Sequence, residues 1–185
     1  LTSKHAIANP WLLNFLLTSA TLLFTVPVAI YYHAVLPNGW GPIILAAIFS
    51  TLFNIFYIFS TYNFDVSTLI PLFNFRSVFA MLIGISFFGE KLTLSQMMFI
   101  AVILMASMFS TMDEKFKLKS FFKRSVAIVL LASLFLAINN AFIKSAQINN
   151  SLWTTNLWIT LLNFFMLIPT IPLFKEELKK LDIAH

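Results

Sequence analysis

The chain has 185 residues, of which 59% are hydrophobic and only 10% are charged, whereas soluble domains carry about 25% charged residues. A soluble fold could not bury this much apolar surface, so we expect a membrane protein whose first partner is lipid. The net charge of +5 does not indicate nucleic-acid binding, because the basic residues lie in short segments between apolar runs. The absence of cysteine excludes disulfides, thiolate catalysis and thiolate metal sites.

Six apolar runs are each long enough to cross about 30 Å of hydrocarbon as a helix. Because these runs do not alternate apolar and polar residues with period two, they do not fit an outer-membrane β-barrel. We therefore predict an all-α fold, a polytopic transmembrane bundle of about six helices. The predicted helices span residues 10–35, 41–62, 66–88, 93–112, 125–147 and 152–174.

The first run follows Lys4 and His5, and its length of about 25 residues is too great for the core of a signal peptide. Because the first residue is Leu1 rather than methionine, we expect the natural start to lie upstream. Pro27 lies inside this run, and we predict a hinge there, although membrane helices also tolerate proline without bending.

Two polar stripes occur at helical spacing, one in the second run and one in the fifth. Their alternative role is hydrogen bonding between helices, but several stripes together favour a shared polar cavity that binds a substrate. Lys144 lies near a helix end and could instead extend its ammonium to the interface. The stripes consist of Ser50, Asn54 and Tyr57, and of Ser133, Asn140 and Lys144.

Arg76 lies near the middle of the third run, where a charge costs about 2.5 kcal/mol or more unless it faces water or a partner. We predict that it contacts an anionic group of a substrate; the alternative is a structural arginine bonded to carbonyl or amide oxygens. Asn74, two residues earlier, points elsewhere on the helix and shares a face with Pro71. We predict a substrate contact at Asn74 and a hinge at Pro71.

The sequence matches itself at an offset of about 142 residues, which indicates an internal repeat. The first and sixth runs are therefore relatives, and their shared polar positions predict further substrate contacts at Asn14, Thr18, Asn156 and Thr160. Pro169 is the repeat partner of Pro27 and is a third predicted hinge. The matched pairs are Trp11 with Trp153, Asn14 with Asn156, Thr18 with Thr160, and Pro27 with Pro169.

The segment from Pro71 to Met108 resembles the end of the repeat unit in the EamA-like group of the drug/metabolite transporter superfamily. The residues that carry this resemblance are Pro71, Gly84, Gly89, Glu90, Lys91 and Leu92. Lys144 in the fifth run takes the place of a lysine that is frequent in the first helix of the family's second unit. The scarcity of glycine departs from the family, although alanine and serine also permit close helix contacts.

The repeat offset and the resemblance together imply a fragment of a ten-helix protein that contains two five-helix repeats. Residues 1–112 would then hold helices two to five of the first repeat, 113–124 a basic connecting loop, and 125–185 the first two helices of the second repeat. The missing helices of the same chain would be partners of this bundle, and a homodimer is a further expectation.

The orientation in the membrane has two conflicting predictions. The positive-inside rule places the basic loop at 113–124 in the cytoplasm, together with Lys4 and the lysines after residue 174. A ten-helix family member that starts inside would place the same loop outside. We favour the charge count, and we expect a multi-pass protein of the plasma membrane, with the bacterial inner membrane as the expected case.

We interpret the chain as a secondary transporter that moves a small polar or amphipathic metabolite by alternating access. We do not expect an enzyme, because a membrane-embedded lipid-modifying enzyme would need clustered acid, base or nucleophile groups at the interface. A non-transporting membrane subunit is the other alternative, and it would have little use for repeated polar stripes. The sequence indicates neither a cofactor nor a metal site: it has no ATP-binding loop, and the three histidines lack metal-ligand spacing.

Overall fold

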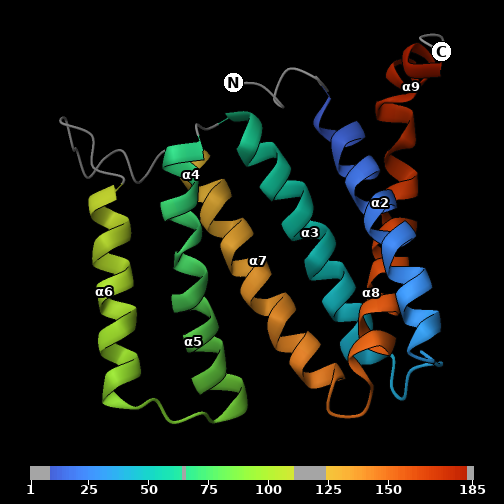
Figure 1. Ribbon diagram of the computed structural model, residues 1–185. Coiled ribbons are helices and arrows are strands. Elements are labelled where there is room, and N and C mark those ends of the chain that lie inside the picture. Colours follow the sequence, from blue (N-terminus) through green and yellow to red (C-terminus); the bar gives the residue numbers. More distant parts are fainter. Residues whose placement is uncertain (1–8, 64–65, 111–123, 183–185) are drawn as a thin grey trace.

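The computed structural model describes residues 9–63, 66–110 and 124–182, and every regular element in these segments is a helix (Figure 1). The all-helical, polytopic fold predicted from the sequence is therefore confirmed. Four stretches of the described chain are long and apolar enough to cross a membrane, at 10–31, 41–62, 126–146 and 152–173. The helices are α2 (Pro10–Tyr31), α3 (Gly41–Asn63), α4 (Val66–Phe73), α5 (Phe75–Phe88), α6 (Leu94–Ser110), α7 (Arg124–Ala146), α8 (Leu152–Leu167), the 3-10 helix η2 (Ile168–Leu173) and α9 (Lys175–Asp182).

Helix ends follow local chemistry. The Asn9 side chain accepts a hydrogen bond from Trp11 N at 2.9 Å, which caps α2 at its first turn. At the other end of α2, His33 has a φ of 52°, a left-handed conformation that stops the helix before residue 35, where the apolar run ends. Ser151 caps α8 in the same way as Asn9 caps α2, because its hydroxyl accepts from Thr154 N at 3.1 Å.

Two predicted spans are interrupted rather than continuous. The third run is divided at Asn74 into α4 and α5, and Pro71, which cannot donate a helix hydrogen bond, lies three residues before the interruption. The sixth run changes from α8 to η2 after Leu167, where Pro169 and Pro172 remove two further backbone donors. Periodicity alone could not show these changes, because the apolar pattern continues through both of them.

Helix α7 packs between α3 and α5, and α8 packs against α2 and α3, so α3 is the centre of the bundle (Figure 1). Small side chains permit this close packing. A buried cluster of Ile43, Ala46, Ala47, Ala146 and Ile159 joins α3 to α7 and α8. Because lipid does not drive apolar helices together, such small residues stabilise the contact through close van der Waals packing.

Hydrogen bonds between helices also hold α3 to its neighbours. Asn139 Nδ2 on α7 donates to Ala46 O at 2.7 Å, a carbonyl oxygen within α3. On the other side of α3, Thr51 Oγ1 donates to Asn163 Oδ1 at 3.0 Å, and Asn163 Nδ2 donates to Ser50 Oγ at 2.9 Å. Ser50 therefore takes part in an interhelical hydrogen bond, which was the alternative interpretation of its stripe.

Helices α2 and α8, the two segments matched by the internal repeat, pack against each other in opposite directions. The ring of Phe15, near the start of α2, lies 5.5 Å from that of Phe164, near the end of α8. At the opposite membrane face, Tyr32 after α2 stacks at 5.1 Å on Trp153 at the start of α8. The packing is antiparallel, and the internal repeat itself stays a prediction.

We predict that Asn163→Leu lowers the free energy of unfolding by about 1 kcal/mol, because interhelical hydrogen bonds in membranes contribute about 0.6 kcal/mol each. Thr51→Val in the Asn163→Leu background should then cost almost nothing further. Unfolding in mixed micelles measures these values. The control is Thr21→Val, whose exposed hydroxyl donates to Leu17 O in its own helix at 2.8 Å. A loss for Thr21→Val as large as that for Thr51→Val alone would contradict the assignment.

Candidate functional site

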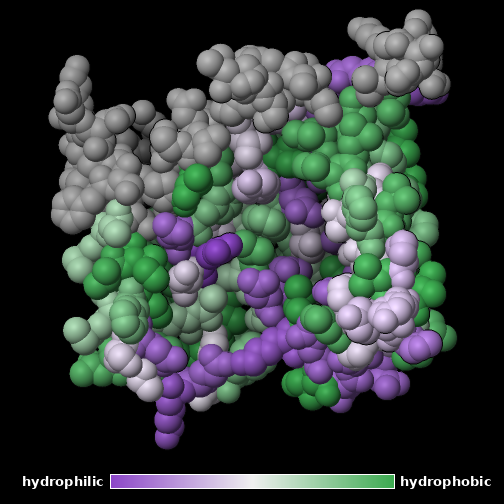
Figure 2. All heavy atoms as spheres, viewed as in Figure 1, coloured by the Kyte–Doolittle hydropathy of each residue, from purple (hydrophilic) through white to green (hydrophobic). Residues whose placement is uncertain are grey.

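Four of the predicted substrate contacts lie on α3 and around the junction of α4 and α5, which the rings of Tyr57 and Phe73 bring together. Arg76 is exposed, Tyr57 is 39% exposed, and Asn54 and Asn74 are half-buried. Figure 2 shows hydrophilic groups interrupting the apolar surface in the middle of the face in view, in the region of α3, α5 and α7. We call Asn54, Tyr57, Asn74 and Arg76 the central patch.

Aromatic contacts bring the two helices of the central patch together. The ring of Phe73, the last residue of α4, lies 5.1 Å from the ring of Tyr57 and 6.4 Å from that of Phe53 on α3. The next residue is Asn74, so the interruption lies directly beside the polar stripe of α3. The sequence predicted the stripe and the polar positions of the third run, and the structure places them next to each other.

The central patch lies deep in the membrane. Arg76 is twelve residues before the end of α5 at Phe88, which corresponds to about 18 Å at 1.5 Å per residue. Asn54 is thirteen residues after the start of α3 at Gly41, or about 20 Å from the same membrane face. Because the hydrocarbon layer is about 30 Å thick, both residues lie near its middle.

Arg76 has an unusual electrostatic position. It is the second residue of α5, and a positive charge in the first turn of a helix opposes the helix dipole. Glu90 pairs with Lys144, and no ion pair joins Arg76 to a carboxylate in the part of the chain that the structure describes. A guanidinium that is exposed at this depth without a pairing acid can bind an anion that enters from water.

Asn140 and Lys144 lie on α7 but at other depths. Asn140 is exposed and about 9 Å from the end of α7 at Ala146, so it is nearer to the membrane face than Arg76. Lys144 forms an ion pair with Glu90 and lies 4.9 Å above the ring of Phe88. It is therefore separate from the central patch.

The repeat-related polar residues lie in the packing between α2 and its neighbours. Asn14 is 3% exposed and Thr18 is buried, whereas their partners Asn156 and Thr160 on α8 are half-buried. The Nδ2 group of Asn14 is buried and has no hydrogen-bond partner among the described residues. The structure does not bring these four residues to the central patch.

The three predicted hinges have different surroundings. Pro27 lies inside α2, which continues through it, and it lines a groove of about 490 Å³ between α2 and α8. Pro71 lies in α4, just before the interruption at Asn74. Pro169 is exposed and lies in η2, where the helix geometry changes. Proline is thus associated with a change of geometry in two of the three positions.

Sequence reasoning did not identify Asn139 as the residue that bonds α7 to α3. Asn139 and Asn140 are adjacent and chemically identical, yet the first is buried and the second exposed. The two residues differ by the 100° rotation per residue along a helix, and this rotation can be used only when the buried face of the helix is known.

The described residues contain no group of three or more His, Asp or Glu side chains that could hold a metal ion.

Water access to the central patch can be tested directly, because the chain contains no cysteine and single-cysteine variants therefore have no background. We predict that Arg76→Cys and Asn54→Cys react with a water-soluble methanethiosulfonate at least tenfold faster than Val102→Cys in vesicles. Val102 is 56% exposed on α6 but is apolar, and thiolates do not form in hydrocarbon. Equally slow reaction at all three positions would show that the central patch faces lipid.

A comparison with known protein families identifies the family to which the chain belongs. The model of the EamA-like transporter family matches residues 1–112, more than half of the chain. Neither the search of curated proteins nor that of solved structures gave a match. The matched segment contains α2 to α6 and the whole central patch, and the apolar spans make the protein a multi-pass membrane protein. The chain therefore belongs to the EamA-like transporter family.

Proposed function

We propose that this protein is a secondary transporter that moves a small polar or amphipathic metabolite by alternating access. In this proposal the central patch binds an anionic group of the metabolite. The family supports transport in general, and the chemistry of the patch supports the anionic group.

The observation that carries this proposal is the place of Arg76. An arginine near the middle of the bilayer is costly unless it is hydrated or paired, and no described acid pairs with it. The planar guanidinium binds carboxylates and phosphates through two parallel hydrogen bonds. Such a residue suits a site that attracts an anion from water and releases it again, because the guanidinium would be hydrated when no anion is bound.

The helix interruption at Asn74 is a second support. Transporters commonly bind substrates near the midplane at broken helices, where the start of a half-helix favours negative charge. Here α5 starts at Phe75, directly before Arg76 and at the same depth as Asn54. Because Asn74 keeps right-handed helical angles between α4 and α5, the guanidinium of Arg76 would supply the main attraction for the anionic group, and the amide of Asn54 could accept or donate hydrogen bonds to the polar remainder.

Alternating access needs two units that can move against each other. We propose that residues 1–112 and 125–185 are these units and that 113–124 connects them. The contact between them is formed mainly by α3 with α7 and α8, where Ala46, Ala47 and Ala146 pack together with larger side chains such as Phe49 and Phe142. The small residues among them permit close helix contacts.

The test is uptake by the intact protein in vesicles, measured with a panel of carboxylates, phosphates and their neutral amides or esters. We predict that the transported compounds include an anion, and that Arg76→Gln lowers kcat/KM for it by about 30- to 100-fold. This corresponds to the loss of charged hydrogen bonds worth about 2 to 3 kcal/mol. Arg76→Lys should retain part of the activity, because a lysine keeps the charge but not the two parallel hydrogen bonds.

The matched control is Lys91→Gln, which removes the same charge from an exposed position in the α5–α6 connection. It should change kcat/KM by less than about twofold, since exposed charges outside the site are screened by salt. Full activity of Arg76→Gln would contradict the proposed role of the central patch. Turnover of a lipid instead of uptake would favour a membrane-embedded enzyme, and neither activity would favour a non-transporting subunit.

A further inference from the structure

A carboxylate, an ammonium group and an aromatic ring meet where the connection after α5 contacts the end of α7. Gly89 has a φ of 61° and reverses the chain at the end of α5, so that Glu90 N donates to Gly84 O at 3.2 Å. The reversal folds the side chain of Glu90 back along the helix that precedes it. The carboxylate is thereby directed toward α7 instead of into bulk water.

Gly84 leaves the space that the carboxylate of Glu90 occupies. A Cβ at Gly84 would lie 2.6 Å from Glu90 Oε2 and 3.4 Å from Glu90 Cδ, distances that any larger residue would make impossible without movement. The carboxylate therefore lies directly on the backbone of α5. A side chain at residue 84 would displace the end of the Glu90 side chain from this place on α5.

The side chain that meets this carboxylate is Lys144 of α7. Its ammonium forms an ion pair with Glu90 Oε1 and lies 4.9 Å above the centroid of the Phe88 ring. A carboxylate beside an aromatic face is the combination that recognises organic ammonium ions, because the ring presents negative potential and the carboxylate supplies the counter-charge. Lys144 thus shows which chemistry the position accepts.

An apolar cavity of about 580 Å³ adjoins this position, between α3, α5 and α7. Phe88 belongs both to the cavity wall and to the contact with Lys144, and Ala141 and Ser145 on either side of Lys144 also line the cavity. The cavity is lined by Phe49, Ile83, Phe87, Phe88, Leu134, Ile138, Ala141, Phe142 and Ser145. Its volume is within the range of about 300 to 1,000 Å³ of small-molecule sites.

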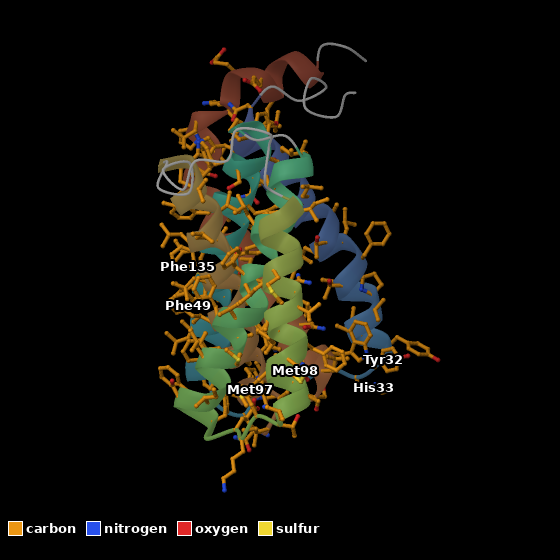
Figure 3. The ribbon with its side chains drawn as sticks, turned by 90° about the vertical axis from the view of Figure 1, so that its left-hand side faces the viewer. Tyr32, His33, Phe49, Met97, Met98 and Phe135 are labelled. Atoms are coloured by element: carbon orange, nitrogen blue, oxygen red, sulfur yellow. The ribbon has the colours of Figure 1, made fainter. Side chains whose placement is uncertain are left out.

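The cavity lies among α3, α5 and α7 on the side of the bundle where Phe49 lies. Phe49 in its wall lies with Phe135 on one side of the bundle, whereas Tyr32 and His33 after α2 lie on the opposite side (Figure 3). None of the four central-patch residues lines the cavity, although Arg76 lies two helical turns before the lining residue Ile83 on the same face of α5.

We propose that Glu90, Phe88 and this cavity form a binding site for an amphipathic organic ammonium ion, and that Lys144 is a tethered occupant that the ligand displaces. The apolar body of the ligand lies among the phenylalanine side chains, and its ammonium takes the place of the lysine ammonium. The site is independent of the proposed function of the central patch.

Two properties make Lys144, and not Glu90, the group that moves. The backbone of Glu90 is held by the hydrogen bond from its N to Gly84 O at 3.2 Å, whereas lysine carries its charge on a flexible stem of four carbons. The side chains of Lys144 and Glu90 are 59% and 45% exposed, so the ion pair is screened by water and is easily exchanged. A displaced ammonium can extend into the headgroup region, where it is hydrated.

The experiment compares three ligands that share one naphthyl body: 2-(1-naphthyl)ethylammonium, the corresponding alcohol, and 1-naphthylacetate. Binding to the purified protein in an uncharged maltoside detergent is measured by naphthyl fluorescence anisotropy, with protein-free micelles as background. We predict that Lys144→Met raises the affinity for the ammonium ligand at least fivefold and leaves that for the alcohol unchanged. Glu90→Gln in the Lys144→Met background should reduce the ammonium affinity to that of the alcohol.

The matched control is Lys91→Met, which removes the same charge from the residue next to Glu90 without removing the ammonium bound to its carboxylate. Its effect on the ammonium ligand should be below twofold. Unchanged alcohol binding and unchanged thermal unfolding show that the variants fold. Three results would each overturn the proposal: equal affinities for ammonium and alcohol in Lys144→Met, a preference for naphthylacetate in the unmodified protein, or no saturable binding of the ammonium ligand to Lys144→Met.

Discussion

In the hydrocarbon core of a membrane, a polar group has no water to bond, so each one must find its partner inside the protein. This constraint fixes the centre of the bundle. Asn139 bonds a carbonyl oxygen of α3 from one side, and Asn163 bonds Thr51 and Ser50 from the other. Asn139 lies on α7 and Asn163 lies on α8, so these hydrogen bonds hold α3 between the two helices. The contacts of Ala46 and Ala47 with Ala146 and Ile159 form around α3 in this position.

Polar groups that have no partner inside the protein are therefore informative about function. The central patch exposes a guanidinium at mid-depth and lies beside a helix interruption, and both features would be costly in contact with lipid. Both features fit the proposed substrate site, which would keep the guanidinium hydrated. The buried, unpartnered amide of Asn14 is a milder exception in the contact between α2 and its neighbours.

The sequence predicted where the helices lie in the chain better than it predicted which side of each helix is buried. Long apolar runs require helices in lipid, so the positions of α2, α3 and α7 could be inferred within a few residues. The interruption at Asn74 could not, because a helix break does not change hydropathy. Nor could the different roles of Asn139 and Asn140, because a helix with apolar residues all around gives no period from which its buried face can be read. Arg76 could be identified because a charge in the middle of a long apolar run needs water or a partner, which marks it without knowledge of the fold.

The residues that carry the family resemblance have local tasks. Gly89 reverses the chain after α5, Gly84 leaves room for a carboxylate, and Glu90 holds Lys144. These tasks shape a hairpin and do not touch the central patch, whose Arg76 and Asn54 lie outside the hairpin's residues. A motif that preserves a turn can therefore persist while the substrate contacts change, so family membership informs the fold more than the cargo. The chemistry of the cargo has to be inferred from the polar residues at mid-depth, where a single side chain decides which charge is attracted.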